Sequence, residues 1–344
     1  MKAIGYRSPG DIDQDESLID IELPTPKASG RDVLIKVSAI SVNPVDTKVR
    51  RAMAPLDGDK YRILGWDAVG EVVEIGDLVE NFRVGDQVWY AGDLTRAGSN
   101  AEYQLVDERI VGKKPQTLTD TEAAALPLTA ITAWELLFDR LNINTVQPSA
   151  PKGTSDQSIL IIGAAGGVGS ILTQLAVKLT NATVIGTASR TESVEWVKSL
   201  GADHVINHHK SFSEQLNALN IASVTHVISL NQTDQHFDQI VDVLAPQGKL
   251  ALIDDPADSI DIKKLKLKSI SLHWEFMYTR SMFNTHDMIK QHELLSELAQ
   301  LIDAGHIKTT VGEHGGIINA ENLKNAHRKL ETNSTVGKIV LEGF

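Results

Sequence analysis

The sequence predicts an α/β protein in which a compact β-rich domain is joined to a doubly wound parallel sheet. Short β-branched runs, cut by glycines and charges, fill the chain up to about Pro127. From Ser158 onward, strand-like and helix-like patterns alternate, which is typical of a parallel sheet with helices on both faces. The 344 residues are enough for two domains with sizeable cores.

The β-rich part contains one strand with clear alternation. Residues 32–40 place Val33, Ile35 and Val37 on one face. Short strands of this kind predict a compact barrel. The other strands expected in this part are residues 69–76, 82–89 and 102–106.

The alternating part follows a helical stretch and a loop. Residues 121–141 are rich in alanine and leucine and have a helical period, whereas residues 145–158 are polar and contain two prolines and a glycine. We therefore expect a helix and then a surface loop. The strands expected beyond the loop are residues 159–162, 183–187, 204–206, 225–230, 249–253 and 269–273.

The strand-like runs at the end of the chain resemble those of the β-rich part more than those of the alternating part. We therefore expect the dinucleotide-binding domain as an insertion at residues 126–307, with the β-rich domain formed by residues 1–125 and 308–344. The elements expected at the end of the chain are helices at residues 291–304 and 320–331 and strands at residues 307–311 and 338–341.

A glycine-rich turn joins the first strand of the alternating part to its first helix. Ala164, Gly166 and Gly169 fill the three small positions of a G-x-G-x-x-G/A fingerprint. Such a turn lets a pyrophosphate approach the backbone and rest on the positive end of a helix. The alternative is a turn that only connects strand and helix, but the flanking pattern that the fingerprint requires is present on both sides. The residues expected to bind a dinucleotide are Gly163, Ala164, Ala165, Gly166, Gly167, Val168 and Gly169.

Composition narrows the class of protein. The net charge of −12 argues against a broad surface for nucleic acid or anionic membrane. The chain has no cysteine, which excludes disulfides, thiolate nucleophiles and cysteine-ligated metals. The first ten residues lack the apolar core of a signal peptide, and no stretch is long enough to span a bilayer. We therefore expect a cytoplasmic protein with no nucleic-acid or membrane partner.

The residues about 20 positions beyond the glycines distinguish NAD from NADP, because an acid there binds the ribose hydroxyls and a cation accommodates a 2′-phosphate. This position falls at Ser189 and Arg190. Arg190 can hold a phosphate through a charge-assisted contact. Glu192 is the nearest carboxylate, but its place is in the first turn of the next helix, where it favours the helix dipole. The pattern predicts NADPH as the cofactor.

Eight motifs carry a resemblance to a known family. The chain resembles the medium-chain dehydrogenase/reductase superfamily, in particular its quinone oxidoreductase branch, which is often labelled "zinc-type alcohol dehydrogenase-like". The resemblance implies a GroES-like β-barrel domain joined to a Rossmann domain, NADPH as cofactor and a homodimer. The motifs are DVLIKV at 32–37, SVNPVDTKVR at 41–50, GWDAVGEVVEIG at 65–76, VENFRVGDQV at 79–88, LPLTAITAW at 126–134, GAAGGVG at 163–169, GADHVIN at 201–207 and GKIVL at 337–341.

The chain departs from the zinc-using relatives at the metal site. Those relatives carry a cysteine where this chain has residues 43–46, and Gly-His-Glu where it has residues 65–67. They also carry a four-cysteine structural loop that this chain lacks. Asp46 and Asp67 could supply carboxylates, but no soft ligand stands near them, and a catalytic zinc needs about three protein ligands. We therefore expect no catalytic metal.

The resemblance also implies further cofactor contacts. Asn43 and Thr132 would lie near the nicotinamide end, and residues 276–278 would pass its amide. Leu230, Ile253 and Lys338 are also expected at the cofactor. The alternative for Leu230 and Ile253 is a packing role in the core of a strand, and the alternative for Lys338 is a solvated position at the end of a strand. The further cofactor residues expected in this way are Asn43, Thr132, Leu230, Asn231, Ile253, Phe276, Met277, Tyr278 and Lys338.

Without a metal, the chemistry favours conjugated acceptors, because the negative charge that develops on hydride addition spreads over the conjugated system. We expect an NADPH-dependent reductase of quinones or α,β-unsaturated carbonyls. The alternatives are an alcohol dehydrogenase and a cofactor-binding protein with little turnover. Arg50 and Arg51 are expected to be solvated. The candidate pocket residues are Asp46, Lys48, Tyr61 and Trp66. The alternative for Asp46 and Lys48 is a surface ion pair. The alternative for Tyr61 is an aromatic side chain at the edge of the barrel, and for Trp66 it is a packing role without contact to substrate.

Overall fold

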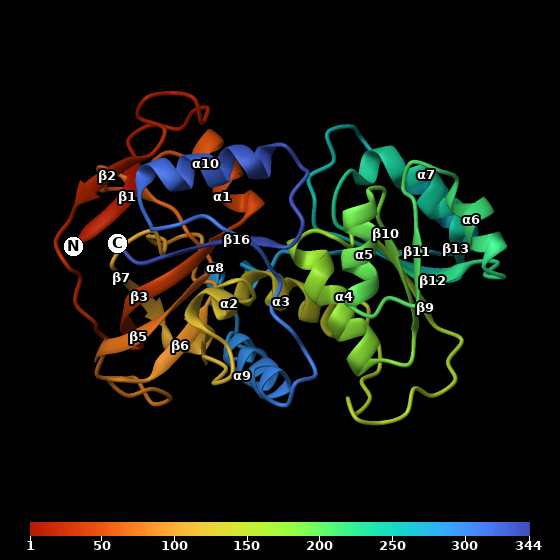
Figure 1. Cartoon of the computed structure of the whole chain (residues 1–344), viewed down its shortest axis with the longest axis horizontal. Helices are drawn as coiled ribbons and strands as arrows, with labels where there is room; N and C mark the ends of the chain where they lie inside the picture. Colours follow the sequence, from red (N-terminus) through yellow and green to blue (C-terminus); the bar gives the residue numbers. More distant parts are fainter. The chain divides into compact units, whose positions relative to one another are not determined.

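A computed structural model describes residues 1–344 of the chain. The contacts divide the chain into two compact units (Figure 1). The first unit contains Met1–Ile131 and Met277–Phe344, and the second contains Thr132–Phe276. The fold class expected from the sequence is confirmed: one unit is built on antiparallel sheets, and the other on a parallel sheet between helices. No helix combines the length and the apolar character that a bilayer crossing requires.

The first unit is centred on the long strand β3 (Asp32–Val42). β3 pairs along one edge with β5 (Ala68–Ile75). Along its other edge it pairs with β7 (Tyr103–Asp107) near its start and with β16 (Lys338–Glu342) near its end, so the end of the chain completes the sheet. The other strands are β1 (Lys2–Tyr6), β2 (Ile19–Glu22), β4 (Arg62–Ile63), β6 (Gln87–Tyr90), β8 (Val111–Lys113) and β15 (Val311–His314). The helical segments are α1 (Pro44–Ala52), η1 (Glu108–Ile110), α2 (Asp120–Ala124), α8 (Thr279–Met282), α9 (Lys290–Asp303) and α10 (Ala320–Glu331).

The pairing of β16 with β3 positions the polar residues of this unit. Ile339 lies opposite Val42 in an antiparallel register. The next pair along this register brings Lys338 beside Asn43, at the point where β3 ends and α1 begins. Two residues that are 295 positions apart in the sequence therefore become neighbours.

The second unit is a six-stranded parallel sheet in the order β11-β10-β9-β12-β13-β14. Its strands have few exposed residues, because helices cover them. The strands are β9 (Ser158–Ile162), β10 (Thr183–Thr187), β11 (His204–Ile206), β12 (Val224–Ser229), β13 (Leu244–Leu252) and β14 (Ser271–Trp274). The helical segments are η2 (Glu135–Arg140), α4 (Gly167–Leu179), α5 (Thr191–Ser199), α6 (Phe212–Ala218), α7 (Thr233–Val243) and η3 (Ile262–Lys268).

Two sequence expectations about single elements need correction. Residues 121–141 do not form one helix: α2 ends before Pro127, which begins α3 (Pro127–Trp134), and a π-helix follows as η2. Proline has no backbone N–H and suits the first turn of a new helix. The strand expected at 307–311 instead begins at its last residue, because Thr309 and Thr310 turn their hydroxyls to carbonyls of α2 and its end. Residues 277–307 belong by their contacts to the first unit, where α9 packs on β8 and η1. The assignment of folding domains stays a prediction.

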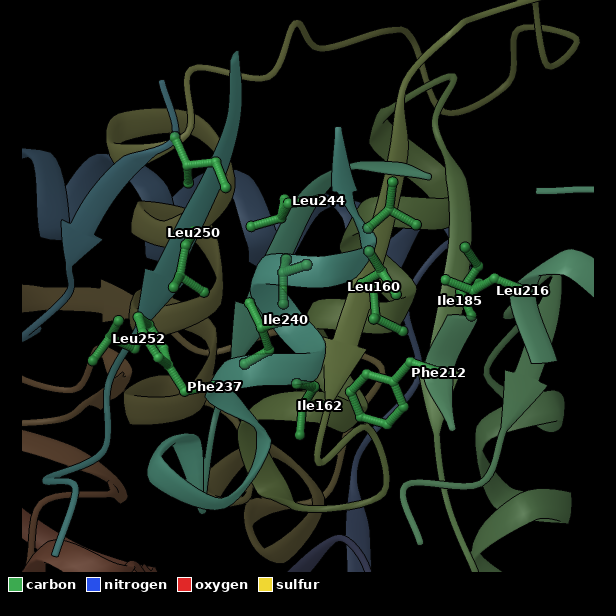
Figure 2. Packing of buried hydrophobic residues seen from close by; sticks show 14 of the residues in the cluster. Leu160, Ile162, Ile185, Phe212, Leu216, Phe237, Ile240, Leu244, Leu250 and Leu252 are labelled. Carbon is green, nitrogen blue, oxygen red and sulfur yellow. The ribbon is translucent and has the colours of Figure 1, made fainter. Parts of the chain in front are cut away.

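Figure 2 shows the apolar cluster that holds one face of the parallel sheet to its helices. Phe212 at the start of α6 is fully buried there with Leu160 of β9 and Ile185 of β10. Leu267 in η3, by contrast, is 95% exposed.

We predict that Phe212→Ala lowers the free energy of unfolding of the second unit by about 3–5 kcal/mol, because truncation removes buried aromatic surface and leaves a cavity. Leu267→Ala is the control and should change it by no more than about 0.5 kcal/mol. Urea unfolding followed by circular dichroism measures both. Equal effects of the two substitutions would contradict the packing described for the sheet.

Candidate functional site

The glycine turn of the second unit has the backbone that a phosphate site needs. Gly163 follows β9 with a φ of +84°, a conformation that favours glycine. Its N–H donates to Oγ1 of Thr187 at 3.1 Å, which ties the turn to the end of β10. At Gly169, an added Cβ would lie 2.3 Å from the carbonyl oxygen of Gly163, so a larger residue would push the helix off the turn. Two of the expected glycines are therefore required by geometry.

The turn also leaves room at the start of α4. Gly166 is the N-cap, no side chain caps the helix, and residues 165–168 are half-exposed. A Cβ on Gly166 would meet only the Gly163 carbonyl oxygen, at 3.5 Å. An open helix N-terminus of this kind attracts anions through its N–H groups and its dipole. The residues present therefore fit the diphosphate of a dinucleotide.

Other expected cofactor residues of this unit lie at the same edge of the sheet, because parallel strands end together there. Leu230 and Asn231 follow β12 and border Gly163: a Cβ built on that glycine would lie 2.8 Å from Oδ1 of Asn231. Ile253 follows β13 and is half-buried. Phe276 is exposed two residues after β14, and Thr132 is buried in α3.

Ser189 and Arg190 lie beyond the end of β10, the strand that pairs with β9. Arg190 is the exposed N-cap of α5. Glu192 is exposed in the first turn of that helix, the place expected for it from the sequence. The cation therefore lies nearer to the strand end than the acid does.

The first unit contains a buried polar group that we call the Asp67 cluster: Asn43, Asp46, Asp67 and Lys338. Lys338 is 4% exposed, and its ammonium donates to Oδ2 of Asp67 at 2.9 Å and to Oδ1 of Asn43. Oδ2 of Asp67 also accepts from Nδ2 of Asn43 at 2.9 Å and from Oγ of Ser41 at 3.0 Å. The alternative weighed for Lys338, a solvated strand end, is wrong, because the β16–β3 register carries its side chain inward.

Asp46 lies in the first turn of α1, where its Oδ2 accepts the backbone N–H of Asn43 at 2.7 Å. The residue is completely buried, and its Oδ1 has no hydrogen-bond partner. Burial raises the pKa of the Asp46 carboxyl to about 7, against the lowering effects of the Asn43 N–H and the Lys338 ammonium. Asp46 is therefore not half of a surface ion pair with Lys48, which is exposed.

The two aromatic candidates lie in different surroundings. Trp66 is completely buried, its indole N–H donates to the carbonyl oxygen of Asp93 at 3.2 Å, and its ring meets Tyr278 edge-on at 6.3 Å between centroids. Tyr61 is half-buried among apolar residues of the small sheet, and its hydroxyl accepts from Arg7 at 3.1 Å. Trp66 therefore contacts Tyr278, which is expected at the cofactor, whereas Tyr61 lies among the apolar residues of the small sheet. Met277 is buried beside Tyr278 in the chain.

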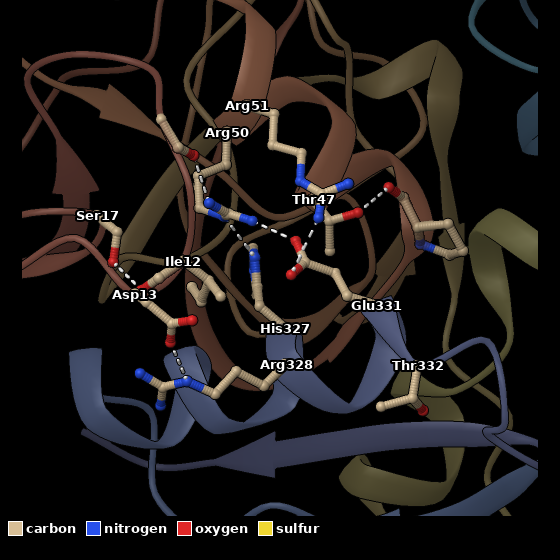
Figure 3. Close-up of polar contacts among 12 residues, drawn as sticks. Ile12, Asp13, Ser17, Thr47, Arg50, Arg51, His327, Arg328, Glu331 and Thr332 are labelled. Atoms are coloured by element: carbon tan, nitrogen blue, oxygen red, sulfur yellow. Dashed lines mark hydrogen bonds and ion pairs between the residues drawn. The ribbon is translucent and has the colours of Figure 1, made fainter.

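A second buried network holds α1 in place (Figure 3). Arg50 is fully buried, and its guanidinium donates to Glu331 of α10, to Nδ1 of His327 and to the Gly10 carbonyl. The expectation of a solvated Arg50 is wrong, because α1 packs on α10; Arg51, whose side chain is 52% exposed, also reaches Glu331. This network anchors the helix whose first turn carries Asp46.

Comparison with known proteins gives the family. Residues 29–116 match the alcohol dehydrogenase GroES-like domain, and residues 200–341 match the zinc-binding dehydrogenase family. A zinc-type alcohol dehydrogenase-like protein of Staphylococcus epidermidis is 40% identical over 341 residues, 99% of each chain. The chain belongs to the medium-chain dehydrogenase/reductase superfamily.

Further relatives have more specific names. The 2-methylene-furan-3-one reductase of Solanum lycopersicum is 29% identical, over 99% of this chain and 79% of its own. A solved structure from Rhizobium etli, described as a candidate zinc-dependent alcohol dehydrogenase, is 51% identical with a TM-score of 0.94, over 100% of this chain and 98% of its own. The quinone oxidoreductase of Coxiella burnetii is 27% identical with a TM-score of 0.79, over 100% of this chain and 99% of its own. The chain is thus an oxidoreductase of this superfamily.

The residues of this chain do not fit the zinc that the family descriptions imply. A catalytic zinc needs about three nitrogen, sulfur or carboxylate ligands and an open position. No three His, Cys, Asp or Glu side chains are placed to hold a metal. The oxygen donors of Asn43 and Asp67 already bind an ammonium, and Trp66 stands where zinc-using relatives carry histidine.

Sequence reasoning missed the pairing of Asp67 with Lys338 and the buried place of Arg50. One local signal was available: Asn43-Pro44-Val45-Asp46 is a helix-start motif, with an N-cap asparagine, proline at the first position and an acid at the third. No local sequence pattern indicates that Lys338 lies beside the residues near position 43.

We predict that Lys338→Met lowers the free energy of unfolding by about 3–5 kcal/mol, because it leaves the Asp67 carboxylate buried without its cation. Adding Asp67→Asn should recover a large part of this loss, and a double-mutant cycle in urea measures the coupling. Lys329→Met is the control, since Lys329 pairs with Glu313 at an exposed site and should change little. Strictly additive effects of the two cluster substitutions would show that the ion pair contributes nothing.

Proposed function

We propose that this protein is an NADPH-dependent reductase of quinones or α,β-unsaturated carbonyls that works without a metal ion. The observation that carries the cofactor half of the proposal is the open glycine turn at the start of α4, with Arg190 rather than an acid following the neighbouring strand β10. NADPH bound there supplies a hydride. The α4 N-terminus would hold the diphosphate, and Ser189 and Arg190 the 2′-phosphate.

The acceptor half of the proposal depends on the Asp67 cluster. With no Lewis acid available, an isolated ketone or alcohol lacks strong polarisation, whereas a quinone or enone spreads the developing charge through its own conjugation. The names of two relatives support this class, since one reduces a 2-methylene-furan-3-one and another is a quinone oxidoreductase. The zinc-type name of the Staphylococcus epidermidis relative is the reason to test alcohols alongside.

A homodimer is part of the proposal. β14 is an edge strand of the parallel sheet, and Trp274 at its end is 53% exposed. An unpaired edge with an exposed aromatic is suited to pairing with a second copy of the chain. The absence of cysteine fits a reducing compartment, so we place the enzyme in the cytoplasm.

We predict that Arg190→Ala lowers kcat/KM for NADPH relative to NADH by about 10–150-fold, because a charged contact to the 2′-phosphate contributes about 1.5–3 kcal/mol. Initial rates with one quinone and each cofactor measure the ratio. Lys198→Ala, which removes an exposed cation from the last turn of the same helix, is the matched control and should leave the ratio unchanged. An unchanged ratio in Arg190→Ala would remove Arg190 from cofactor selection.

We predict that the purified protein oxidises NADPH with quinones and enones and does not reduce NADP⁺ with primary or secondary alcohols. Absorbance of the reduced nicotinamide follows both directions. Alcohol oxidation at a higher kcat/KM than quinone reduction would favour an alcohol dehydrogenase. Tight NADPH binding without consumption of any acceptor would favour a binding protein.

A further inference from the structure

A second turn meets the glycine turn at the edge of the parallel sheet. It consists of residues 230–232 and joins β12 to α7. The N–H of Leu230 donates to the carbonyl oxygen of Ile162, the last residue of β9, at 3.2 Å. The side chain of Asn231 lies over Gly163, where its Oδ1 would be 2.8 Å from an added Cβ. The path of residues 230–232 therefore decides which groups border the glycine turn.

This second turn contains an unfavourable backbone conformation. Gln232 has a φ of +52° and a ψ of +37°, in the left-handed region. A residue with a side chain rarely adopts this conformation, because its Cβ comes too close to the following carbonyl oxygen. Gln232 is also the N-cap of α7, and its side chain does not cap the helix. Contacts from another part of the chain must therefore hold the turn.

Asp254 supplies these contacts from the loop that follows β13. Its Oδ2 accepts the N–H of Thr233, the first residue of α7, at 2.9 Å. Its Oδ1 accepts the hydroxyl of Thr233 at 2.5 Å. A carboxylate at the start of a helix satisfies a free N–H and interacts favourably with the helix dipole. Asp254 therefore caps α7 in place of Gln232.

The hydrogen bonds continue into the end of β12. Oγ1 of Thr233 lies 2.7 Å from Oγ of Ser229, the last residue of β12, and both side chains are completely buried. Because the Thr233 hydroxyl gives its proton to Asp254, Ser229 is the donor in this pair. Ser229 and Thr233 flank residues 230–232 in the sequence. The chain of hydrogen bonds from Ser229 to Asp254 therefore closes the turn at both of its ends.

We propose that Asp254 is a positioning residue for the dinucleotide: through Thr233 it holds residues 230–232 in the conformation that places Asn231 beside the glycine turn. This inference rests on the proposed function, in which the glycine turn binds NADPH. The diphosphate at that turn is common to NADPH and NADH, whereas Arg190 acts on the 2′-phosphate. Asp254 therefore sets the affinity for both cofactors, and Arg190 sets the preference between them.

Two other roles for the Asp254 carboxylate make different predictions. If it only caps α7, its loss should change stability and not binding. Asp261 is the matched control for this role, because it is the N-cap of η3 and its Oδ1 accepts the N–H of Lys263 at 3.0 Å. If Asp254 instead contacts the cofactor, a repaired turn should not restore binding. Gln232→Gly repairs the turn, because glycine adopts the left-handed conformation readily.

The experiment measures the Kd of NADPH and of NADH for the full chain by the fluorescence of the reduced nicotinamide. Asp254→Ala should raise both Kd values by about tenfold or more, because the turn that binds becomes a minor conformation, and should leave their ratio unchanged. Thr233→Val should also raise both Kd values, whereas Thr233→Ser keeps the hydroxyl and should bind as wild type does. Asp261→Ala should bind as wild type does.

The double variant Asp254→Ala/Gln232→Gly should recover a large part of the lost affinity. No recovery would show that the carboxylate contacts the cofactor itself, and a wild-type Kd in Asp254→Ala would show that it only caps α7. Either result would overturn the proposal. If Asp254→Ala fails to fold, Thr233→Val and Thr233→Ser decide in its place, and equal Kd values for these two variants would overturn the proposal.

Hydrogen–deuterium exchange of the free chain gives a readout that needs no cofactor. Asp254→Ala should speed exchange in peptides that cover residues 228–236 and also in those that cover residues 160–167, because the glycine turn loses the neighbour that packs on Gly163. Asp261→Ala should change neither. Faster exchange confined to residues 228–236 would overturn the proposal. If wild type binds neither dinucleotide, the proposed function fails on its own, and exchange still decides whether Asp254 holds the two turns together.

Discussion

The ammonium of Lys338, bound between Asn43 and Asp67, is the contact on which the polar interior of the first unit depends. It can form only because β16 pairs with β3 in one register, which joins the two ends of the chain. A shift by one residue would turn Lys338 to the other face and leave Asp67 buried without a cation. The same contact occupies one oxygen of Asn43 and one of Asp67, so these oxygens are not free to bind a metal ion. One ion pair therefore influences both the fold and the set of donors that a metal ion could use.

The second unit depends on apolar packing rather than on a buried ion pair. Its sheet is held to its helices by buried apolar side chains, and the glycine turn lies at the edge where the strands end. Gly163 and Gly169 let the backbone pass close to the start of α4, and Leu230 and Asn231, which follow β12, border that turn. A diphosphate site made of backbone N–H groups needs no charged side chain of its own, which is why we propose Ser189 and Arg190 as the residues that select the cofactor.

Much of this could be predicted from the sequence because the signals are local. The strand–helix alternation, the glycine turn and the place of Glu192 follow from periodicity and from spacing along a few residues. Lys338 and Arg50 were misjudged because a charged side chain is normally solvated, and only long-range pairing buries these two. Arg50 meets Glu331 across 281 residues, a separation for which no local pattern exists. Tyr61 was grouped with the pocket by its position in the chain, whereas the structure places it on the small sheet.

The central claim is that an internal ammonium takes the place of a metal ion, and zinc content tests it most directly. The purified chain would be incubated with excess zinc, desalted, and measured for zinc per chain and for NADPH oxidation by a quinone, before and after treatment with a chelator. The account predicts far less than one zinc per chain and the same activity throughout. One zinc bound per chain, with activity that is lost on chelation and restored by zinc, would contradict it.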